Sequence, residues 1–269
     1  MSYYGYERVY INGCSHSQGG GLEGPELRDD SVFPLYKEKY GVEKWDDRTR
    51  LNFGHHLSEL IGIPHLNEAE SGGGTERVVR MAYNWLLDNW EIRDKVILIL
   101  ENPDPSRFEV YYRPVGEYFI LNTNINAEEG SGEFVSSTRK YYGSETSNED
   151  KMIEPIFMKW FNNHANIREN WKRIERDFVG LYSFCKWNGI KIFVMTGNSV
   201  TFKECFDKED IIKFGNDEKN YDICSWAIDN RKTISDELDG KSADRHPGYF
   251  GHKEYAELLK VFLDKRLNK

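Results

Sequence analysis

The sequence contains no paired-cysteine motif and no long apolar segment. Its 269 residues include four cysteines, none in a CxxC pair or in the spacing of a secreted disulfide scaffold: Cys14, Cys185, Cys205 and Cys224. No apolar run approaches the roughly 20 residues that a membrane-spanning helix needs, and the first residues lack the basic and apolar parts of a signal peptide. We therefore expect reduced thiols, a cytoplasmic location and no membrane partner.

Basic clusters are missing as well. The formal net charge is −9 at pH 7, and every group of Lys and Arg residues has acidic residues nearby. The sequence therefore offers no positive surface that would neutralise phosphates. The glycines Gly19, Gly20 and Gly21 do not follow the GxGxxG spacing of a dinucleotide-binding loop. We expect neither a nucleic-acid partner nor a nucleotide cofactor.

What the chain does contain is an alternation of apolar strands and amphipathic helices. Short apolar runs predict strands at 7–12, 63–67, 95–100 and 189–195, and apolar residues at helical spacing predict helices at 51–61, 75–90 and 152–187, the last with a break near 162–166. This order predicts an α/β fold with a central parallel sheet and helices on both faces. Residues 211–214 are a weaker candidate for a fifth strand. A final helix is expected from Tyr255, after a turn through Gly248 and Gly251.

One insertion interrupts this alternation. Residues 108–112 and 117–121 alternate in polarity around Pro114 and Gly116, which predicts a hairpin. Residues 122–150 are rich in Asn, Glu, Ser, Thr and Gly, and we interpret them as a mobile insertion or lid, or else a plain surface loop. We therefore expect one domain over residues 1–269, with a hairpin and loop inserted at about 103–150.

Chemistry-bearing side chains gather where the first strand ends. The apolar run is followed at once by small and polar residues: Gly13, Cys14, Ser15, His16 and Ser17. Open α/β sheets carry their catalytic and binding residues at this end of the strands. A serine nucleophile needs a base. Asp244 and His246 stand two apart in an extended segment, so both side chains face the same way and the carboxylate can orient the imidazole.

Two further segments could bind an oxyanion. Gly72, Gly73 and Gly74 lie between a strand and a helix, where backbone N–H groups can hold an anion, although a flexible turn explains them equally well. Asn102 follows the 95–100 strand and is therefore expected at the same sheet edge as Ser15.

Four segments in this order resemble the SGNH (GDSL-like) hydrolase superfamily: Gly13-Cys14-Ser15, Asn67 to Gly74, Asn102, and Asp244 to His246. The resemblance spans almost the whole chain and implies a flavodoxin-like three-layer α/β/α sandwich. It also implies that Ser15 is the nucleophile, His246 the base and Asp244 the group that orients it. The Ser15 and Gly72 N–H groups and the Asn102 amide would form the oxyanion hole. Ser17 is the reserve nucleophile, and the resemblance implies no metal and no organic cofactor.

The chain departs from the family pattern in three places. Cys14 replaces the aspartate of the usual Gly-Asp-Ser, and Glu101-Asn102-Pro103 replaces the usual Gly-x-Asn-Asp. The usual Asp-x-x-His is shortened to Asp-x-His, a spacing that resembles polysaccharide O-acetyltransferases. The last segment also resembles small SGNH-like proteins encoded in phage genomes. If the protein is phage-encoded, virion association is an alternative to the cytoplasmic location.

The leading functional hypothesis is a serine esterase that removes a short acyl group, such as acetyl, from a carbohydrate or small ester. One alternative is an O-acyltransferase. A second is a non-catalytic, glycan-binding or virion component, in view of the insertion and an aromatic content of 14%. A third is a metal hydrolase with ligands chosen from six residues: His16, His55, His56, Asp244, His246 and His252. The sequence indicates no oligomeric state.

Overall fold

The computed structural model describes residues 2–20, 22, 33–41, 48–103, 107–113, 117–126, 131–139, 155–159, 167–196, 203–214, 222–242 and 244–268. Its centre is a parallel sheet in the order β2-β1-β3-β7. The four strands are β1 (Arg8–Asn12), β2 (His65–Asn67), β3 (Val96–Asn102) and β7 (Lys191–Thr196). Beyond β7, Ile211 forms a single parallel bridge to Val194, so the expected fifth strand is reduced to one bridge. The strand order is that of flavodoxin-like sheets.

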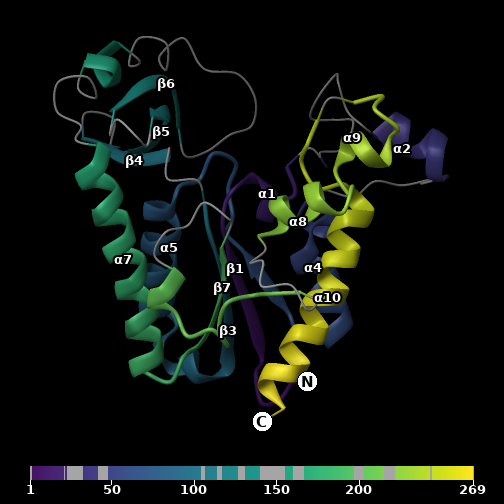
Figure 1. Ribbon diagram of the computed structural model, residues 1–269. Coiled ribbons are helices and arrows are strands. Elements are labelled where there is room, and N and C mark those ends of the chain that lie inside the picture. The colour runs from purple at the N-terminus through teal and green to yellow at the C-terminus, as the bar shows by residue number, and fades with distance from the viewer. Residues whose placement is uncertain are drawn as a thin grey trace.

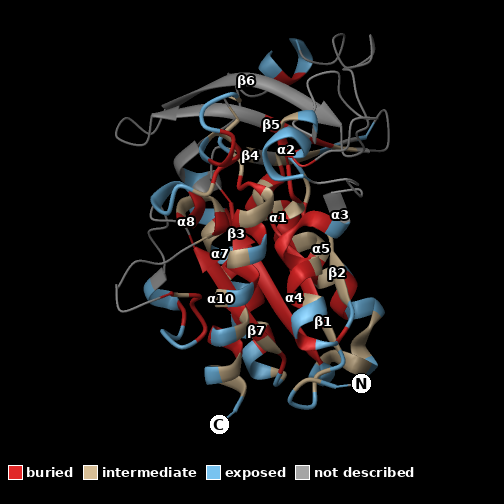
Figure 2. Ribbon diagram, turned by 90° about the vertical axis from the view of Figure 1, so that its right-hand side faces the viewer, coloured by how far each residue is buried: buried red, intermediate tan, exposed pale blue. Residues whose placement is uncertain are grey.

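Helices cover both faces of this sheet (Figure 1). One face packs on α5 (Thr75–Asp88) and α7 (Ile167–Trp187), and the other on α4 (Phe53–Ile61), α8 (Ile223–Asp229) and α10 (Tyr249–Leu267). Successive strand residues alternate between the two cores, with Val9 and Ile11 in one and Tyr10 in the other. Every residue of β3 is buried (Figure 2), whereas the three residues of the edge strand β2 are partly exposed. The predicted three-layer α/β/α architecture is confirmed.

Local sequence explains the ends of α4. At the N-terminus of α4, the Asn52 side chain accepts a hydrogen bond from the His55 N–H. At the C-terminus, Gly62 has a left-handed backbone (φ 72°), and its N–H donates to the Ser58 carbonyl.

Six shorter elements connect the layers: α1 (Ser15–Gln18), α2 (Phe33–Tyr40), α3 (Arg48–Leu51), the 3₁₀ turns η1 (Trp90–Lys95) and η2 (Lys203–Cys205), and α9 (Ile234–Glu237). Residues 155–159 are helical, whereas the break expected near 162–166 lies outside the described residues. Within the described part of the chain, no helix has both the length and the apolarity to cross a bilayer.

The insertion forms a second, antiparallel sheet in the order β4-β5-β6, at the end of the molecule where α1 lies (Figure 1). Its strands are β4 (Arg107–Tyr112), β5 (Glu117–Asn126) and β6 (Ser131–Arg139). The β4–β5 hairpin confirms the prediction, but 122–126 and 131–139 are strands rather than loop. β6 is a strand because its backbone pairs with β5. Its own polar sequence does not predict a strand. Residues 127–130 and 140–150 of the expected lid lie outside the described residues.

The last helix begins earlier than the sequence predicts. α10 starts at Tyr249, with Gly248 as its N-cap, so Gly251 lies within the helix instead of in a turn. The Gly251 N–H donates a hydrogen bond to the buried Glu237 carboxylate. A Cβ on Gly251 would lie 2.5 Å from the Lys232 carbonyl oxygen. This glycine therefore permits close helix packing and does not mark a chain reversal.

Replacement of Gly251 by alanine tests this packing. Alanine favours helix by about 0.5–1 kcal/mol over glycine, yet the clash with the Lys232 carbonyl should outweigh that gain and destabilise the fold by about 1–3 kcal/mol. The matched control is Gly180→Ala in α7, where nothing approaches the added Cβ, and which should raise the melting temperature. Thermal unfolding of both variants measures the difference; equal stabilisation by the two substitutions would contradict this packing.

Candidate active site

Ser15, His246 and Asp244 form a continuous hydrogen-bonded chain. The His246 Nε2 atom lies 3.0 Å from the Ser15 Oγ, and its Nδ1 atom lies 2.7 Å from the Asp244 Oδ1. The serine is the first residue of α1, which follows β1, while the other two precede α10, and His246 is 231 positions along the chain from Ser15. If Nδ1 carries the proton that faces the carboxylate, Nε2 can accept the serine proton. The geometry is that of a nucleophile, a base and an orienting carboxylate.

Backbone pairing holds the segment that carries the histidine. The carbonyl groups of Asp244 and His246 accept hydrogen bonds from the Ser235 and Ile234 N–H groups, each at 2.8 Å. Thr233 pairs with Pro247 in an antiparallel bridge. The Asp244 carboxylate also accepts the His246 backbone N–H at 2.8 Å. Asp244 and His246 are thus held in place by hydrogen bonds to residues 234–235 and to each other.

Glu101 holds the turn between β1 and α1. Its carboxylate is buried and accepts hydrogen bonds from the Cys14 N–H at 2.9 Å and from the Ser17 hydroxyl at 2.7 Å. Sequence reasoning treated Glu101 only as a departure from the family pattern, and its place next to Asn102 on a buried strand was the one available signal. Burying a carboxylate is costly unless hydrogen bonds compensate it, so this contact specifies the geometry of the turn.

The reserve nucleophile Ser17 occupies a different environment from Ser15. Its side chain is fully buried, and its hydroxyl donates to Glu101. Cys14 is buried as well, and its pKa is raised well above the usual range by desolvation and by the nearby Glu101 carboxylate. A thiol in that state is a poor nucleophile. Of the three candidates, Ser15 is the one whose side chain is hydrogen-bonded to His246.

Gly20 is a site residue that sequence reasoning did not single out. A Cβ at this position would lie 3.1 Å from the His246 Nε2 atom and 3.1 Å from the Ser15 Cβ. The glycine therefore lets the end of α1 pass directly against the serine–histidine pair. The glycine run after the first strand was the available signal, although its spacing alone does not reveal which glycine is needed.

Asn102 is oriented by a neighbouring helix. Its Oδ1 atom accepts a hydrogen bond from the Thr75 hydroxyl at 2.8 Å, and both side chains are buried. This contact assigns the carbonyl end of the amide to Thr75 and makes the NH₂ end the donor toward other groups. The strand register pairs Asn12 of β1 with Leu100 of β3, so Asn102 extends beyond the end of β1, at the sheet edge that carries Ser15.

The Gly72 to Gly74 loop is tied to the end of β1. Gly72 has a left-handed backbone (φ 76°), and the Gly73 N–H donates to the Glu70 carbonyl. The buried Arg77 guanidinium anchors the loop because it binds the Glu68 carbonyl at 2.7 Å and the Glu70 carboxylate at 2.7 Å. The Gly73 N–H is therefore occupied by a hydrogen bond within the loop.

The second loop also contacts α1 directly. The Asn67 side-chain amide donates to the Ser17 carbonyl at 2.9 Å, and the Ser71 N–H donates to the Gln18 side chain at 2.8 Å. The segments that follow β1 and β2 are therefore joined by hydrogen bonds at the sheet edge, where the sequence predicted that they would meet.

The structure does not gather the ligands of the metal-hydrolase alternative. His252 is fully buried in α10, where its Nδ1 atom accepts the Phe53 N–H and desolvation holds its pKa well below the usual range. Desolvation also lowers the pKa of His56, to about 4. Across the described ranges, no three of the six residues in that alternative bring ligand atoms within 4.8 Å of one another.

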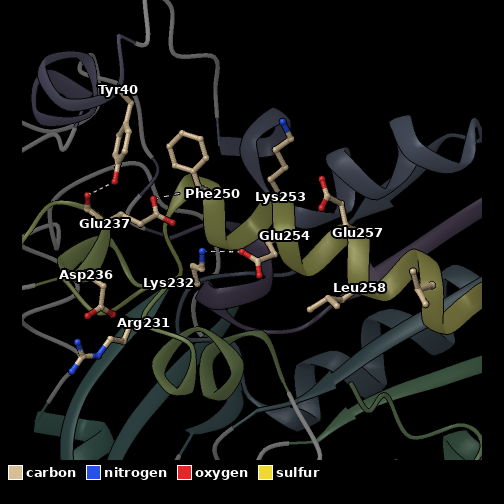
Figure 3. Close-up of a pocket in the computed structure, with 11 residues that line it drawn as sticks. Tyr40, Arg231, Lys232, Asp236, Glu237, Phe250, Lys253, Glu254, Glu257 and Leu258 are labelled. Atoms are coloured by element: carbon tan, nitrogen blue, oxygen red, sulfur yellow. Dashed lines mark hydrogen bonds and ion pairs between the residues drawn. The ribbon is translucent and has the colours of Figure 1, made fainter. Parts of the chain in front are cut away.

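A surface pocket of about 850 Å³ lies along α9 and α10 (Figure 3). Residues of both charge signs line it, and the Lys232–Glu254 ion pair at 2.9 Å spans part of it. Neither Ser15, Asp244 nor His246 is among its lining residues. The hydrogen-bonded serine, histidine and aspartate therefore lie outside the lining of this pocket.

Comparison with known proteins gives matches to solved structures only. No family model matches the chain, and no curated protein matches it. An acetyl xylan esterase from the rumen bacterium Butyrivibrio proteoclasticus is 11% identical over 98% of this chain, with a TM-score of 0.44. A carbohydrate esterase whose active site has divergent catalytic and non-catalytic binding functions is 11% identical over 96%, with a TM-score of 0.39. A G-D-S-L family lipolytic protein from Desulfitobacterium hafniense is 12% identical over 95%, with a TM-score of 0.33.

These matches differ in how much of the other protein they include. The chain spans 65% of the acetyl xylan esterase, 68% of the carbohydrate esterase and 99% of the G-D-S-L protein. With identities of 11–12% and TM-scores below 0.5, they do not decide what this chain does. Functional inference therefore depends on the side chains at its own sheet edge.

The Gly20 contact predicts that a single methyl group will disturb the serine–histidine pair. Gly20→Ala should push the Ser15 and His246 side chains apart by a few tenths of an ångström. We expect fluorophosphonate labelling of Ser15 to slow by about 10- to 100-fold, since small displacements of reacting groups are costly. Labelling rate and melting temperature should be measured together, with Gly180→Ala as the control that keeps the wild-type rate. An unchanged labelling rate in Gly20→Ala would show that this contact is not needed.

Proposed function

We propose that this protein is a serine ester hydrolase of the SGNH type. The observation that carries the proposal is the hydrogen-bonded chain from Ser15 through His246 to Asp244, assembled from the two ends of the sequence. An isolated histidine near a serine is common, but a histidine with one ring nitrogen on a serine and the other on a carboxylate has the arrangement required for acyl transfer.

In the proposed reaction, the Ser15 Oγ attacks the ester carbonyl while His246 Nε2 takes its proton. Asp244 stabilises the imidazolium and keeps its orientation. The imidazolium then gives the proton to the departing alcohol, which leaves an acyl group on Ser15. A water molecule, activated by the same imidazole, hydrolyses the acyl-enzyme and restores the serine.

The negative charge on the former carbonyl oxygen needs fixed donors. The proposed set is the Ser15 N–H, the Gly72 N–H and the Asn102 side-chain NH₂, each on a different segment at the sheet edge. Donors that are oriented in advance contribute about 3–4 kcal/mol each to such a transition state. The Thr75 hydrogen bond to Asn102 supports this role because it fixes which end of the amide donates.

The exposure of the reacting groups favours a small acyl group on a larger alcohol. Ser15 is 5% exposed, whereas 32% of the His246 side chain is accessible. The acyl group must fit beside the buried serine, while the leaving alcohol lies on the side of the more open histidine. We therefore propose a short acyl group, such as acetyl, carried by a carbohydrate hydroxyl or another small alcohol.

Labelling with a fluorophosphonate tests the nucleophile. The wild-type protein should gain one adduct, located on Ser15 by peptide mass spectrometry, and Ser15→Ala should lose both the adduct and the hydrolysis of nitrophenyl acetate. Ser183→Ala, at an exposed serine of α7, is the matched control and should keep both. An adduct on Ser17, or wild-type turnover by Ser15→Ala, would overturn the assignment. No adduct on folded wild-type protein would instead favour the glycan-binding alternative.

The orienting carboxylate can be tested separately. Asp244→Asn preserves shape, but its amide can donate to His246 Nδ1 and thereby favour the tautomer that protonates Nε2. We expect kcat for nitrophenyl acetate to fall by up to about 10⁴-fold with little change in KM, as in other Ser-His-Asp triads. Circular dichroism should show an unchanged fold. A variant that retains wild-type kcat would show that Asp244 does not orient the base.

A further inference from the structure

Three potential metal ligands meet directly beneath the turn that carries Ser15. The Cys14 Sγ atom lies 3.0 Å from the His16 Nδ1 atom and 3.2 Å from the Glu101 Oε1 atom, and the last two atoms are 4.0 Å apart. Among the described residues, this is the one group of three or more His, Cys, Asp and Glu side chains whose ligand atoms all lie within 4.8 Å of one another. It is separate from the serine–histidine–aspartate chain, and it shares only His16 with the six residues considered from sequence.

The spacing of these atoms is close to that of a tetrahedral metal centre. Zinc bonds of about 2.3 Å to sulfur and about 2.0–2.1 Å to nitrogen or oxygen place neighbouring ligand atoms about 3.3–3.6 Å apart. Each of the three separations differs from this range by less than an ångström. Side-chain rotation alone could close such differences, so no rearrangement of the strands would be needed.

Glu101 is already oriented for this role. Its Oε2 atom accepts the Cys14 N–H and the Ser17 hydroxyl, while its Oε1 atom is the one near the thiol and the imidazole. Metal-binding carboxylates commonly have one oxygen held by hydrogen bonds and the other directed at the metal. The side chain is 3% exposed, so its orientation is also fixed by packing.

The surroundings of the cluster are rich in negative and sulfur-bearing groups. Cys224 on α8 interacts with His16 through a side-chain hydrogen bond, and the half-buried Asp222 carboxylate interacts electrostatically with both Glu101 and His16. Two carboxylates and two thiols thus surround one imidazole. A bound cation would stabilise this arrangement in a region where the effective dielectric constant is low.

We propose that Cys14, His16 and Glu101 form a zinc-binding site that holds the Ser15 turn. One sulfur, one nitrogen and one oxygen ligand suit Zn²⁺ better than Mg²⁺ or Ca²⁺, which prefer oxygen alone. Because Cys14 and His16 flank Ser15 in the chain, a metal bound to both constrains the serine from either side. The proposal departs from the expectation that no metal is required, and it does not depend on the proposed esterase activity.

Metal binding by the whole chain is the test, with zinc content and stability as readouts. Protein treated with a chelator, dialysed and supplied with Zn²⁺ should retain about one zinc per chain after gel filtration, measured by mass spectrometry of the metal. Its melting temperature should rise with zinc concentration, because a ligand that binds only the folded state stabilises it. Co²⁺ in place of zinc should produce the near-ultraviolet absorption of a cobalt–thiolate bond.

Substitutions show whether the zinc is at this site. Cys14→Ser and His16→Gln should each weaken zinc binding by on the order of 100-fold or more, and Cys14→Ser should abolish the cobalt–thiolate band. Cys205→Ser, at an exposed cysteine in η2, is the matched control and should keep both. Circular dichroism shows whether each variant folds. If one of the two ligand variants does not fold, zinc binding by the other one tests the site. Wild-type protein that binds no zinc, or ligand variants that bind it as tightly as wild type, would overturn the proposal and leave an ordinary buried hydrogen-bond cluster.

Discussion

The buried Glu101 carboxylate is the constraint on which the rest of the site depends. It comes from β3, yet it binds the backbone and side chains of the turn that follows β1. The parallel pairing of these two strands sets the position of that carboxylate. A buried carboxyl group needs hydrogen-bond partners in a particular arrangement, so the turn is held in one geometry, and Ser15 is presented at the sheet edge.

The other two residues of the site, Asp244 and His246, lie near the C-terminal end of the chain. The segment with Asp244 and His246 pairs its backbone with residues 232–235, ahead of α10. α10 packs on α4 and on the sheet through a large apolar core. The histidine is therefore positioned by the packing of the helical layer, and the serine by the sheet. Correct placement of the pair depends on the relative position of these layers, which close packing makes rigid.

Close approach is the recurring reason for glycine in this region. Gly20 leaves room for the serine and the histidine, and Gly251 leaves room for the Lys232 carbonyl. Gly13 is similar, because a Cβ there would overlap the Glu101 side chain. None of these three has the positive φ that identifies a glycine needed for a turn. In a sequence, a glycine is usually interpreted as a turn residue, and Gly251 was therefore predicted to lie in a turn.

The sequence by itself determined the alternation of strands and helices, the residues that line the two cores and the set of polar residues at the strand ends. These features follow from local periodicity and from the rule that parallel strands end at a common edge. Only the tertiary structure decided which side chains touch: Ser15 with His246, Ser17 with Glu101, and Cys14 with His16 and Glu101. It also decided that residues 131–139 form a strand, because that strand is specified by its partner and not by its own composition. Contacts between residues far apart in sequence depend on how whole layers pack, and no local pattern encodes them.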